Sequence, residues 1–422
     1  MSFRIQTLHA RQVLDSRGDP TIEVRVTLDG GTRAQASTPS GASTGTHEAL
    51  ELRDGPGGAY RGRSVLGAAG HVNTELAAAL TGFDARDQAT VDRRMIELDG
   101  TPDKSRLGAN AILGVSMAVA RAAALTAGLP LWKHLAQNRP ARIPVPMINI
   151  LSGGLHAGRN IEFQDFLAVP HRFPALAEAL EAAVRIHRAT AEMLRSAGHV
   201  LTGVADEGGF GPRLDSNRAA LDLLTRAIER AGFVPGRDVS IAIDVASTHF
   251  FEDGRYHLAS EGRRLTAAEM TNLLGQWLDD YPVVSIEDPL AEDDWDAWRD
   301  LTARLGSRCR LIGDDLFATN LARLERGIRG GVANAVLVKM NQIGTLTETF
   351  EVIDRAREAG YTVVISARSG ETEDSFLADL AVASGSGHIK VGSVTRSERL
   401  AKYNRLLEIE ELEEGHAPFA MR

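Results

Sequence analysis

The sequence predicts an α/β protein in two parts: a small α+β capping domain over residues 1–138 and a TIM-type α/β barrel over residues 139–422. The first part opens with strand and turn signals and continues with helical patterns. The second part alternates short, continuously apolar strands with amphipathic helices, which is typical of a buried parallel sheet. The long series of such units favours a barrel over an open sheet, and no glycine fingerprint for a dinucleotide supports a doubly wound fold.

The predicted capping domain begins with strands. Residues 21–28, with the sequence TIEVRVTL, alternate polar and apolar side chains with a period of two, as expected for a half-buried strand. The turn signals DSRGDP and DGG flank this stretch, and residues 32–38 form the next expected strand. A loop rich in Gly, Ser and Thr follows, and helical patterns fill residues 60–138.

The barrel strands are predicted from apolar runs, of which residues 142–150 form the first. The later expected strands are residues 239–245, 282–288, 309–315, 334–340, 361–367 and 388–393. Amphipathic helices, such as residues 266–280 and 345–360, lie between them. Gly232 and Gly360 each come just before a strand, where a glycine suits the C-terminal cap of a helix.

Composition excludes several classes of protein. The 422 residues carry a formal net charge of -9, so we do not expect binding of nucleic acid through phosphate neutralisation. Cys309 is the only cysteine, which excludes a disulfide framework and favours a reducing compartment. No apolar signal core is present at the N-terminus. Residues 107–132 are the best candidate for a membrane span, but Asn110 and Arg121 interrupt them, so a buried helix is expected.

Charged residues recur at the ends of the predicted barrel strands, about one strand–helix unit apart. In a barrel the carboxyl ends of the parallel strands lie on one face, where active sites are found. Each charge alone is better explained as a solvated loop residue or an ion pair, but the whole set is costly to bury and indicates a functional site. The set comprises Asp244, Glu287, Asp314, Lys339, Arg368 and Lys390, with Ala367 next to Arg368.

The residue types indicate a divalent cation and an acid–base reaction. Three carboxylates from adjacent strands form an oxygen-rich site that suits Mg²⁺ better than zinc. Such an ion would hold a substrate carboxylate and acidify the proton on the neighbouring carbon. A lysine among other cations has a lowered pKa and can remove that proton. Glu207, in the loop VADEGGFGP, is a candidate acid for the loss of a β-hydroxyl, although taken alone it is better explained as a turn residue.

Two further glycine-rich stretches fit the same site. Residues 38–55 lack the Gly-Lys-Ser/Thr of a P-loop, and we interpret them as a mobile lid whose hydroxyls reach a metal or phosphate. The stretch LSGGLHAGRNIEFQDF places His156 in a loop and Gln164 and Asp165 at the end of a short strand. A lone loop histidine is more often structural or solvated than catalytic.

A series of long stretches, in order along the chain, matches one known family. They are DSRGDPTIEV, PSGASTG, ALELRDG, GANAILGVS, DEGGFGP, SIEDPL, GDDLFATN, VKMNQIGTLTET, SARSGETED and AKYNRLLEIEE. Through them the chain resembles the enolase family almost end to end. The resemblance implies an N-terminal α+β domain, an eight-fold α/β barrel with an irregular start, and two Mg²⁺ ions. It also implies a small phospho- or phosphono-carboxylate substrate, a cytoplasmic enzyme, and a homodimer or octamer, without nucleic-acid or membrane partners.

The resemblance assigns metal and base positions. Asp244, Glu287 and Asp314 resemble the ligands of the first magnesium. Ser43, in the lid, resembles the serine that joins the second magnesium, and Lys339 resembles the base that takes the α-proton.

It also assigns the acid and the substrate contacts. Glu207 resembles the acid that assists loss of the hydroxyl, Arg368 and Ser369 resemble phosphate contacts, and Lys390 resembles a contact of the substrate carboxylate. Three further residues fall on substrate-binding positions, namely His156, Gln164 and Asp165.

Three positions depart from the family pattern. The family has His where this chain has Ala367, Glu where it has Asp165, and usually an acidic residue where it has His249. Loss of an imidazole at Ala367 removes a hydrogen-bond donor and leaves space for water or a larger group. Two changes on one side of the pocket, with the metal ligands and base intact, are interpreted as a retuned site.

Three hypotheses follow. The favoured one is an enolase-like lyase with a retuned phospho or phosphono substrate, such as the carboxyphosphonoenolpyruvate synthases of phosphonate and phosphinate biosynthesis. The alternative is an ordinary enolase that interconverts 2-phosphoglycerate and phosphoenolpyruvate. The third, a non-catalytic binding protein on the same scaffold, is disfavoured by the intact set of charged residues.

Overall fold

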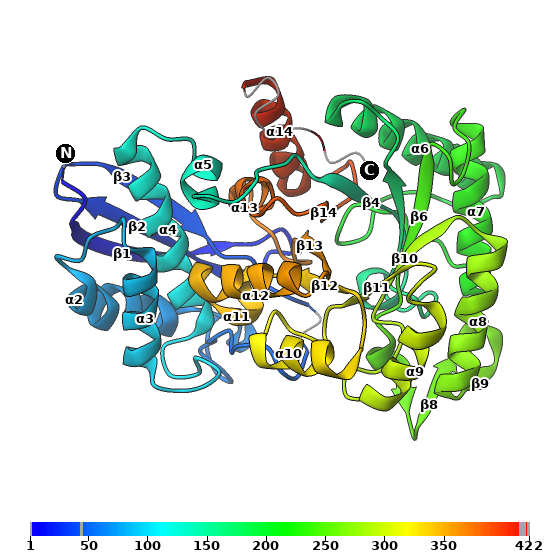
Figure 1. The fold of residues 1–422 in the computed structure, drawn as a ribbon, viewed down its shortest axis with the longest axis horizontal. Helices are drawn as coiled ribbons and strands as arrows, with labels where there is room; N and C mark the ends of the chain where they lie inside the picture. Colours follow the sequence, from blue (N-terminus) through cyan, green and yellow to red (C-terminus); the bar gives the residue numbers. More distant parts are fainter. Residues whose placement is uncertain (1, 43–44, 413–418, 420–422) are drawn as a thin grey trace.

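The computed structural model describes residues 2–42, 45–412 and 419. It contains a three-stranded sheet with helices, followed by a closed barrel of eight strands, and this confirms the predicted fold class. Figure 1 shows the sheet on the left and the barrel strands on the right. The domain boundary between residues 138 and 139 stays a prediction; it falls between the last helix of the first part and the first barrel strand.

An antiparallel sheet forms the first part. Its strands are β1 (Ile5–Leu14), β2 (Pro20–Leu28) and β3 (Arg33–Ser37), paired in that order. Ile22, Val24 and Val26 alternate along β2 and are fully buried, as the period of two predicts. Helix α4 (Ala109–Ala127) lies against β2 and β3. At Gly114 an added Cβ atom would lie 2.6 Å from Val24 Cγ2, so this glycine lets the helix approach the sheet closely.

Among the described residues, α4 is the helix long and apolar enough to cross a membrane, but 89% of that window is buried inside the structure. Asn110 exchanges hydrogen bonds with the backbone of Leu52, and Arg121 pairs with the Asp374 carboxylate at 2.7 Å. The expected buried helix is therefore confirmed. The other helices of this part are η1 (Tyr60–Gly62), α1 (Leu66–His71), η2 (Val72–Leu76), α2 (Ala77–Leu80), α3 (Gln88–Asp99) and α5 (Leu131–Ala136).

The barrel closes in the strand order β10-β11-β12-β13-β14-β4-β5-β6. Its strands are β4 (Val145–Ser152), β5 (Asp165–Pro170), β6 (Val239–Asp244), β10 (Val283–Glu287), β11 (Arg310–Gly313), β12 (Ala335–Val338), β13 (Thr362–Ser366) and β14 (His388–Gly392). The strands predicted from apolar runs all lie within this ring. Their carboxyl ends meet on one face, as the prediction of a shared site requires.

One strand runs against the others. β5 is antiparallel to both β4 and β6, because residues 153–164 join β4 to β5 through the short η3 (Gly154–Ala157) and without a crossover helix. The prediction that Gln164 and Asp165 end a strand was therefore wrong, since β5 begins at Asp165. The reversal still places Asp165 at the catalytic face, where it pairs in register with Asp244.

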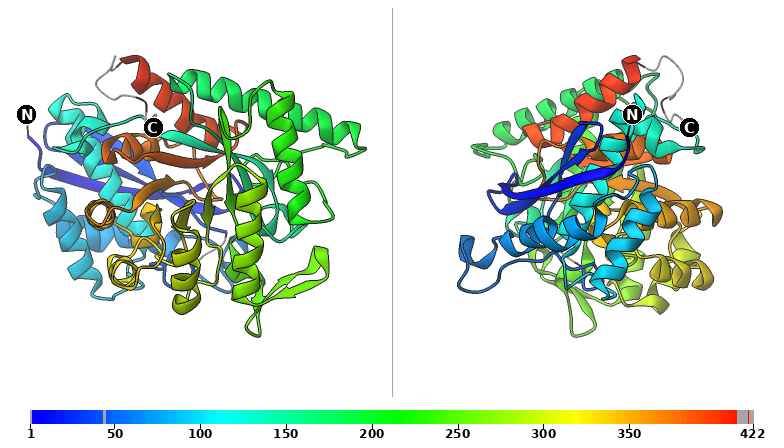
Figure 2. Two further views of the ribbon diagram at one scale, coloured as in Figure 1. Left: turned by 45° about the vertical axis from the view of Figure 1, so that its right-hand side comes forward. Right: turned by 90° about the vertical axis from the view of Figure 1, so that its left-hand side faces the viewer.

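Helices surround the ring of strands (Figure 1 and Figure 2). They are α6 (Leu176–Ser196), α7 (Asn217–Arg230), α8 (Ala267–Asp280), α9 (Trp295–Leu305), α10 (Leu321–Gly330), α11 (Met340–Ile343), α12 (Leu346–Glu358), α13 (Phe376–Ser384) and α14 (Ser397–Leu412). Gly232 and Gly360 follow α7 and α12 with φ of +88° and +79°, as their predicted capping role requires. Thr266 and Glu269 form a capping box at the start of α8.

A small sheet interrupts the barrel repeat after β6 and projects from it (Figure 2). It follows η4 (Ser247–Phe250) and consists of β7 (Phe251–Glu252), β8 (Arg255–Leu258) and β9 (Arg263–Leu265), with η5 (Ala259–Glu261) between β8 and β9.

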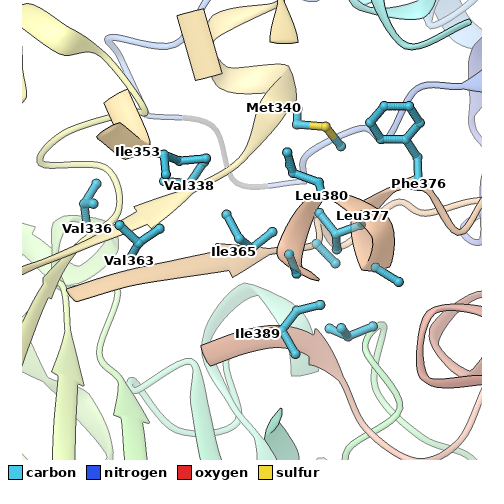
Figure 3. Packing of buried hydrophobic residues seen from close by; sticks show 14 of the residues in the cluster. Val336, Val338, Met340, Ile353, Val363, Ile365, Phe376, Leu377, Leu380 and Ile389 are labelled. Carbon is cyan, nitrogen blue, oxygen red and sulfur yellow. The ribbon is translucent and has the colours of Figure 1, made fainter. Parts of the chain in front are cut away.

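The strands that end at the charged residues are fixed by a dense core. Figure 3 shows Val338 of β12 beside Ile353 of α12, and Ile365 of β13 and Ile389 of β14 on the side of α13 that carries Leu377 and Leu380. Burial of each such side chain contributes about 1.5–3 kcal/mol to folding. This core holds the strand ends in place although the charges next to them are costly to bury.

Candidate active site

Asp244 and Glu287 lie side by side at the ends of neighbouring strands, paired in register between β6 and β10. Lys390, from β14 on the other side of the ring, places its Nζ 2.6 Å from Asp244 Oδ2 and 2.8 Å from Glu287 Oε2. All three side chains are buried. Burial alone would lower the pKa of Lys390, but the two carboxylates outweigh burial and raise that pKa well above its ordinary value.

Asp314 and Lys339 form a second buried ion pair beside the first. Lys339 Nζ donates to Asp314 Oδ2, and the amide of Gln342 donates to Asp314 Oδ1 at 2.9 Å. Burial would lower the pKa of Lys339, but the Asp314 carboxylate outweighs it, and the pKa is raised. The expectation of a lowered pKa for this lysine is therefore wrong for this arrangement, because its nearest partner is an anion.

The carboxylate cluster fits a divalent cation. Burial first, and the Asp244 carboxylate next, raise the pKa of Glu287 well above its ordinary value, so further positive charge here would be favourable. The Lys390 ammonium group already bridges Asp244 and Glu287, which are hard oxygen donors of the kind that Mg²⁺ binds.

A second acidic group lies next to this cluster. Oxygen atoms of Asp288, Asp314 and Asp315 lie within 4.8 Å of one another. The Asp288 carboxylate accepts the backbone N–H groups of Asp314 and Asp315 at 2.9 and 2.8 Å. Asp288 therefore holds the turn that follows β11 and thereby orients Asp314.

On the opposite side of the pocket, His156 lies between two acids. Its Nδ1 is 2.9 Å from Asp165 Oδ2, and its Nε2 is 3.9 Å from Glu207 Oε1. Burial alone would lower the pKa of His156, but the carboxylates of Asp165 and Glu207 raise it to about 9. Burial would raise the pKa of Glu207, whereas His156 and Arg399 lower it on balance. At neutral pH the pair is therefore an imidazolium beside a carboxylate, and the dissociable proton is on His156.

Arg368 and Ser369 lie where β13 meets the capping domain. Arg368 donates two hydrogen bonds to the Glu48 carboxylate, at 2.9 and 3.2 Å, and both side chains are buried. Ser369 Oγ accepts the backbone N–H of Ala42 at 2.7 Å and a hydrogen bond from Arg17 at 3.2 Å. Arg368 and Ser369 are thus buried donors that could hold an anion, and Arg368 is already paired with the Glu48 carboxylate.

The predicted lid contacts the site through the residues on both sides of positions 43–44. Ser43 lies outside the described residues. Ala42, before it, is tied to Ser369, and Gly45, after it, approaches Asp315 so closely that an added Cβ would lie 3.0 Å from Oδ1. Thr46 donates to Glu292 at 2.9 Å.

Three more predicted positions lie around the pocket. Gln164 donates from Nε2 to Asp244 Oδ2 at 3.3 Å, and its Oε1 is buried without a hydrogen-bond partner among the described residues. Ala367 is buried at the end of β13, where its N–H donates to the carbonyl of Lys390 at 2.8 Å. His249 lies on η4, just beyond Asp244, and burial lowers its pKa.

The structure thus brings the predicted site residues that it describes, which are all of them except Ser43, to one face of the barrel. Sequence reasoning missed Glu48 and Gln342, which hold Arg368 and Asp314. Gln342 lies inside the matched stretch VKMNQIGTLTET, and Glu48 lies in the predicted lid, one residue before ALELRDG. Their roles depend on contacts between distant segments.

The chain matches two family models along most of its length. The model of the enolase N-terminal domain matches residues 5–135, and that of the enolase C-terminal TIM barrel domain matches residues 140–422. Over 416 residues, 54% are identical to an enolase of Acidothermus cellulolyticus, and the match covers 99% of this chain and 96% of that relative.

Proposed function

The chain belongs to the enolase family of lyases, and on this premise we propose that it interconverts 2-phosphoglycerate and phosphoenolpyruvate by loss and gain of water. The observation that carries the proposal is the pairing of two buried lysines with three buried carboxylates at the strand ends, opposite a buried imidazolium–carboxylate pair. One side can remove a proton from carbon, and the other can protonate a leaving hydroxyl.

The comparisons correct the favoured sequence-based hypothesis. They give no support to a retuned phosphono substrate and favour the alternative, an ordinary enolase. This chain has Ala367 where the family has His, but the geometry offers a reason why enolase activity can persist without that histidine. His156 already brings an imidazole to within 3.9 Å of Glu207, so the acid side has a histidine from another loop.

We assign the metal to Asp244, Glu287 and Asp314, with Ser43 joining a second ion. The family depends on Mg²⁺, and the buried carboxylates with an ammonium group between them fit such an ion. Bound Mg²⁺ would stabilise the negative charge that develops on the substrate carboxylate when the neighbouring proton is removed. Lys390 would then turn from the ligands toward that carboxylate.

Lys339 is the proposed base. In the present arrangement its ammonium group is held by Asp314, and that carboxylate keeps its pKa raised. A cation held by Asp314 would weaken this attraction and lower the pKa of Lys339, which would favour the neutral amine. Cation binding and activation of the base would thereby be coupled through Asp314.

Glu207 is the proposed acid, supported by His156. The proton stored on the His156–Glu207 pair passes to the hydroxyl on the carbon next to the deprotonated one, and the hydroxyl leaves as water. Asp165 contacts the His156 ring at 2.9 Å and holds it in place. The proton taken by Lys339 leaves to solvent or returns in the reverse reaction.

Arg368, Ser369 and Gln164 are the proposed substrate contacts. Arg368 is held by Glu48, and a phosphate would compete with that carboxylate for its guanidinium group. Gln164 carries a buried oxygen without a described partner, which suits a hydroxyl donor. Cytoplasmic location and assembly into a homodimer or octamer are carried over from the family as part of this proposal.

Turnover of 2-phosphoglycerate by the purified protein tests the proposal. We expect phosphoenolpyruvate to form with Mg²⁺ present, and we expect a chelator to stop its formation and added Mg²⁺ to restore it. Absence of product with 2-phosphoglycerate, while a phosphono-carboxylate analogue is converted, would contradict this proposal and support a retuned substrate instead.

A further inference from the structure

We propose that Asn149 and Ser152, on β4, are positioning residues that hold the acid side of the pocket together. They do so in two ways: they fix the Asp165 carboxylate that orients His156, and they seat the glycine loop that carries Glu207. This inference rests on the proposed function, because it concerns the step that Glu207 and His156 perform.

The first contact fixes Asp165. Asn149 Nδ2 donates to Asp165 Oδ1 at 2.5 Å, and Ser152 Oγ donates to the same oxygen at 2.9 Å. The other oxygen, Oδ2, is left to His156. Asn149, Ser152 and Asp165 are all fully buried, so solvent does not replace these donors. With both donors on Oδ1, the carboxylate cannot rotate, and Oδ2 stays directed at the imidazole.

The second contact seats the loop of Glu207. At Gly209 an added Cβ atom would lie 2.5 Å from Asn149 Oδ1 and 3.0 Å from Ser152 Oγ. The loop backbone therefore lies directly on these two side chains, and only a glycine allows this approach. Hydrogen bonds between Ser152 N and the Phe210 carbonyl, and between Phe210 N and the Ile150 carbonyl, fasten the loop to β4 at the same place.

Both contacts involve the same two side chains, those of Asn149 and Ser152. One supports Asp165 and hence His156, and the other supports the loop that carries Glu207. The separation of 3.9 Å between His156 Nε2 and Glu207 Oε1 therefore depends on Asn149 and Ser152 from both directions. Lys339 and its partner Asp314 receive no hydrogen bond from either residue.

The base side and the acid side should consequently respond differently to Ser152→Ala. Exchange of the substrate α-proton with deuterated solvent reports the base, and formation of phosphoenolpyruvate reports the acid. We expect product formation to fall about 10- to 100-fold, as for a small misplacement of a catalytic group, while exchange stays within about twofold of the wild type. Asn149→Ala should show the same split.

Two variants complete the experiment. Ser152→Thr keeps the hydroxyl and should restore most of the product formation. Ser240→Ala is the matched control, since it removes a buried serine hydroxyl that contacts His171 at 2.8 Å, four residues before Asp244 on β6. It should change neither rate.

The outcomes are distinct. Equal loss of exchange and product formation in Ser152→Ala, or no loss of either, overturns the positioning role. Failure of Ser152→Thr to recover product formation also counts against it. A wild-type protein that shows neither exchange nor product would instead refute the proposed function itself.

Discussion

The two sides of the pocket are built differently. On the base side, Asp244, Glu287 and Lys339 lie at or just after the ends of parallel strands, and opposite charges neutralise one another directly. On the acid side, His156 and Glu207 lie in glycine-rich loops, and the antiparallel β5 supplies Asp165. The base side is positioned by the regular repeat of the barrel, and the acid side by side-chain hydrogen bonds to an irregular segment.

The two sides should therefore differ in how strongly they respond to substitutions. A strand end is fixed by the core beneath it, so its side chain moves little when a neighbour changes. A loop held by a few buried hydrogen bonds is more sensitive to small substitutions, because each lost partner leaves a buried polar group unpaired. One of the three departures from the family pattern, Asp165, lies on this more sensitive side, in contact with His156. Ala367 lies at the end of β13, where its N–H donates to the carbonyl of Lys390.

The largest expected effect is on the base side. Lys339→Ala should lower exchange of the substrate α-proton by about 10²- to 10⁴-fold, the usual contribution of a general base. Calorimetric titration with Mg²⁺ should show affinity close to that of the wild type. Lys104→Ala is the matched control, since Lys104 is also a buried lysine in an ion pair, with Glu348 at 2.9 Å, but lies outside the pocket. Exchange that survives in Lys339→Ala would exclude this residue as the base.

A smaller effect, on stability, is expected on the acid side. The pKa of His156 is raised to about 9 in the folded protein, so the stabilisation from its charge is complete below its unfolded pKa of about 6.5 and is lost as pH rises through 9. The free energy of unfolding should fall by about 3 kcal/mol over this window in the wild type. His156→Gln should remove this dependence.

Denaturant unfolding across that pH range, in the presence of a chelator, measures this contribution. His134→Gln is a suitable control, because burial lowers the pKa of His134 and its titration lies below the window. An unchanged alkaline slope in His156→Gln would show that the imidazolium is not held by Asp165 and Glu207.

The smallest effect is expected from Ala367→His. Since His156 already serves Glu207, restoring the family residue should change turnover of 2-phosphoglycerate by no more than about threefold, well below the contribution of a catalytic acid or base. Steady-state kinetics of the two proteins side by side measure this. A rise of tenfold or more over a slow wild type would mean that the pocket was retuned after all.

The sequence alone predicted the base side well. The apolar strands that stop at Asp244, Glu287 and Lys339 could be placed in the barrel, because a regular strand–helix repeat fixes where each strand ends. The acid side was less predictable. Nothing in the local pattern shows that β5 reverses direction, and so Asp165 was placed at the wrong end of its strand.

Other features could not be predicted because they depend on distant contacts. The raised pKa of Lys339 follows from the approach of Asp314, whereas the sequence showed only that cations were near. Glu48 meets Arg368 across the junction of the capping domain and the barrel. Residue type and spacing indicate which groups reach the pocket, but not which of them pair in it.

The most direct test of the two-sided account is Glu207→Gln, with both rates measured in one sample. We expect exchange of the substrate α-proton to continue close to the wild-type rate, while phosphoenolpyruvate formation falls about 10²- to 10⁴-fold, as expected for loss of a general acid. Loss of exchange together with product formation would contradict it, because the base side would then depend on Glu207.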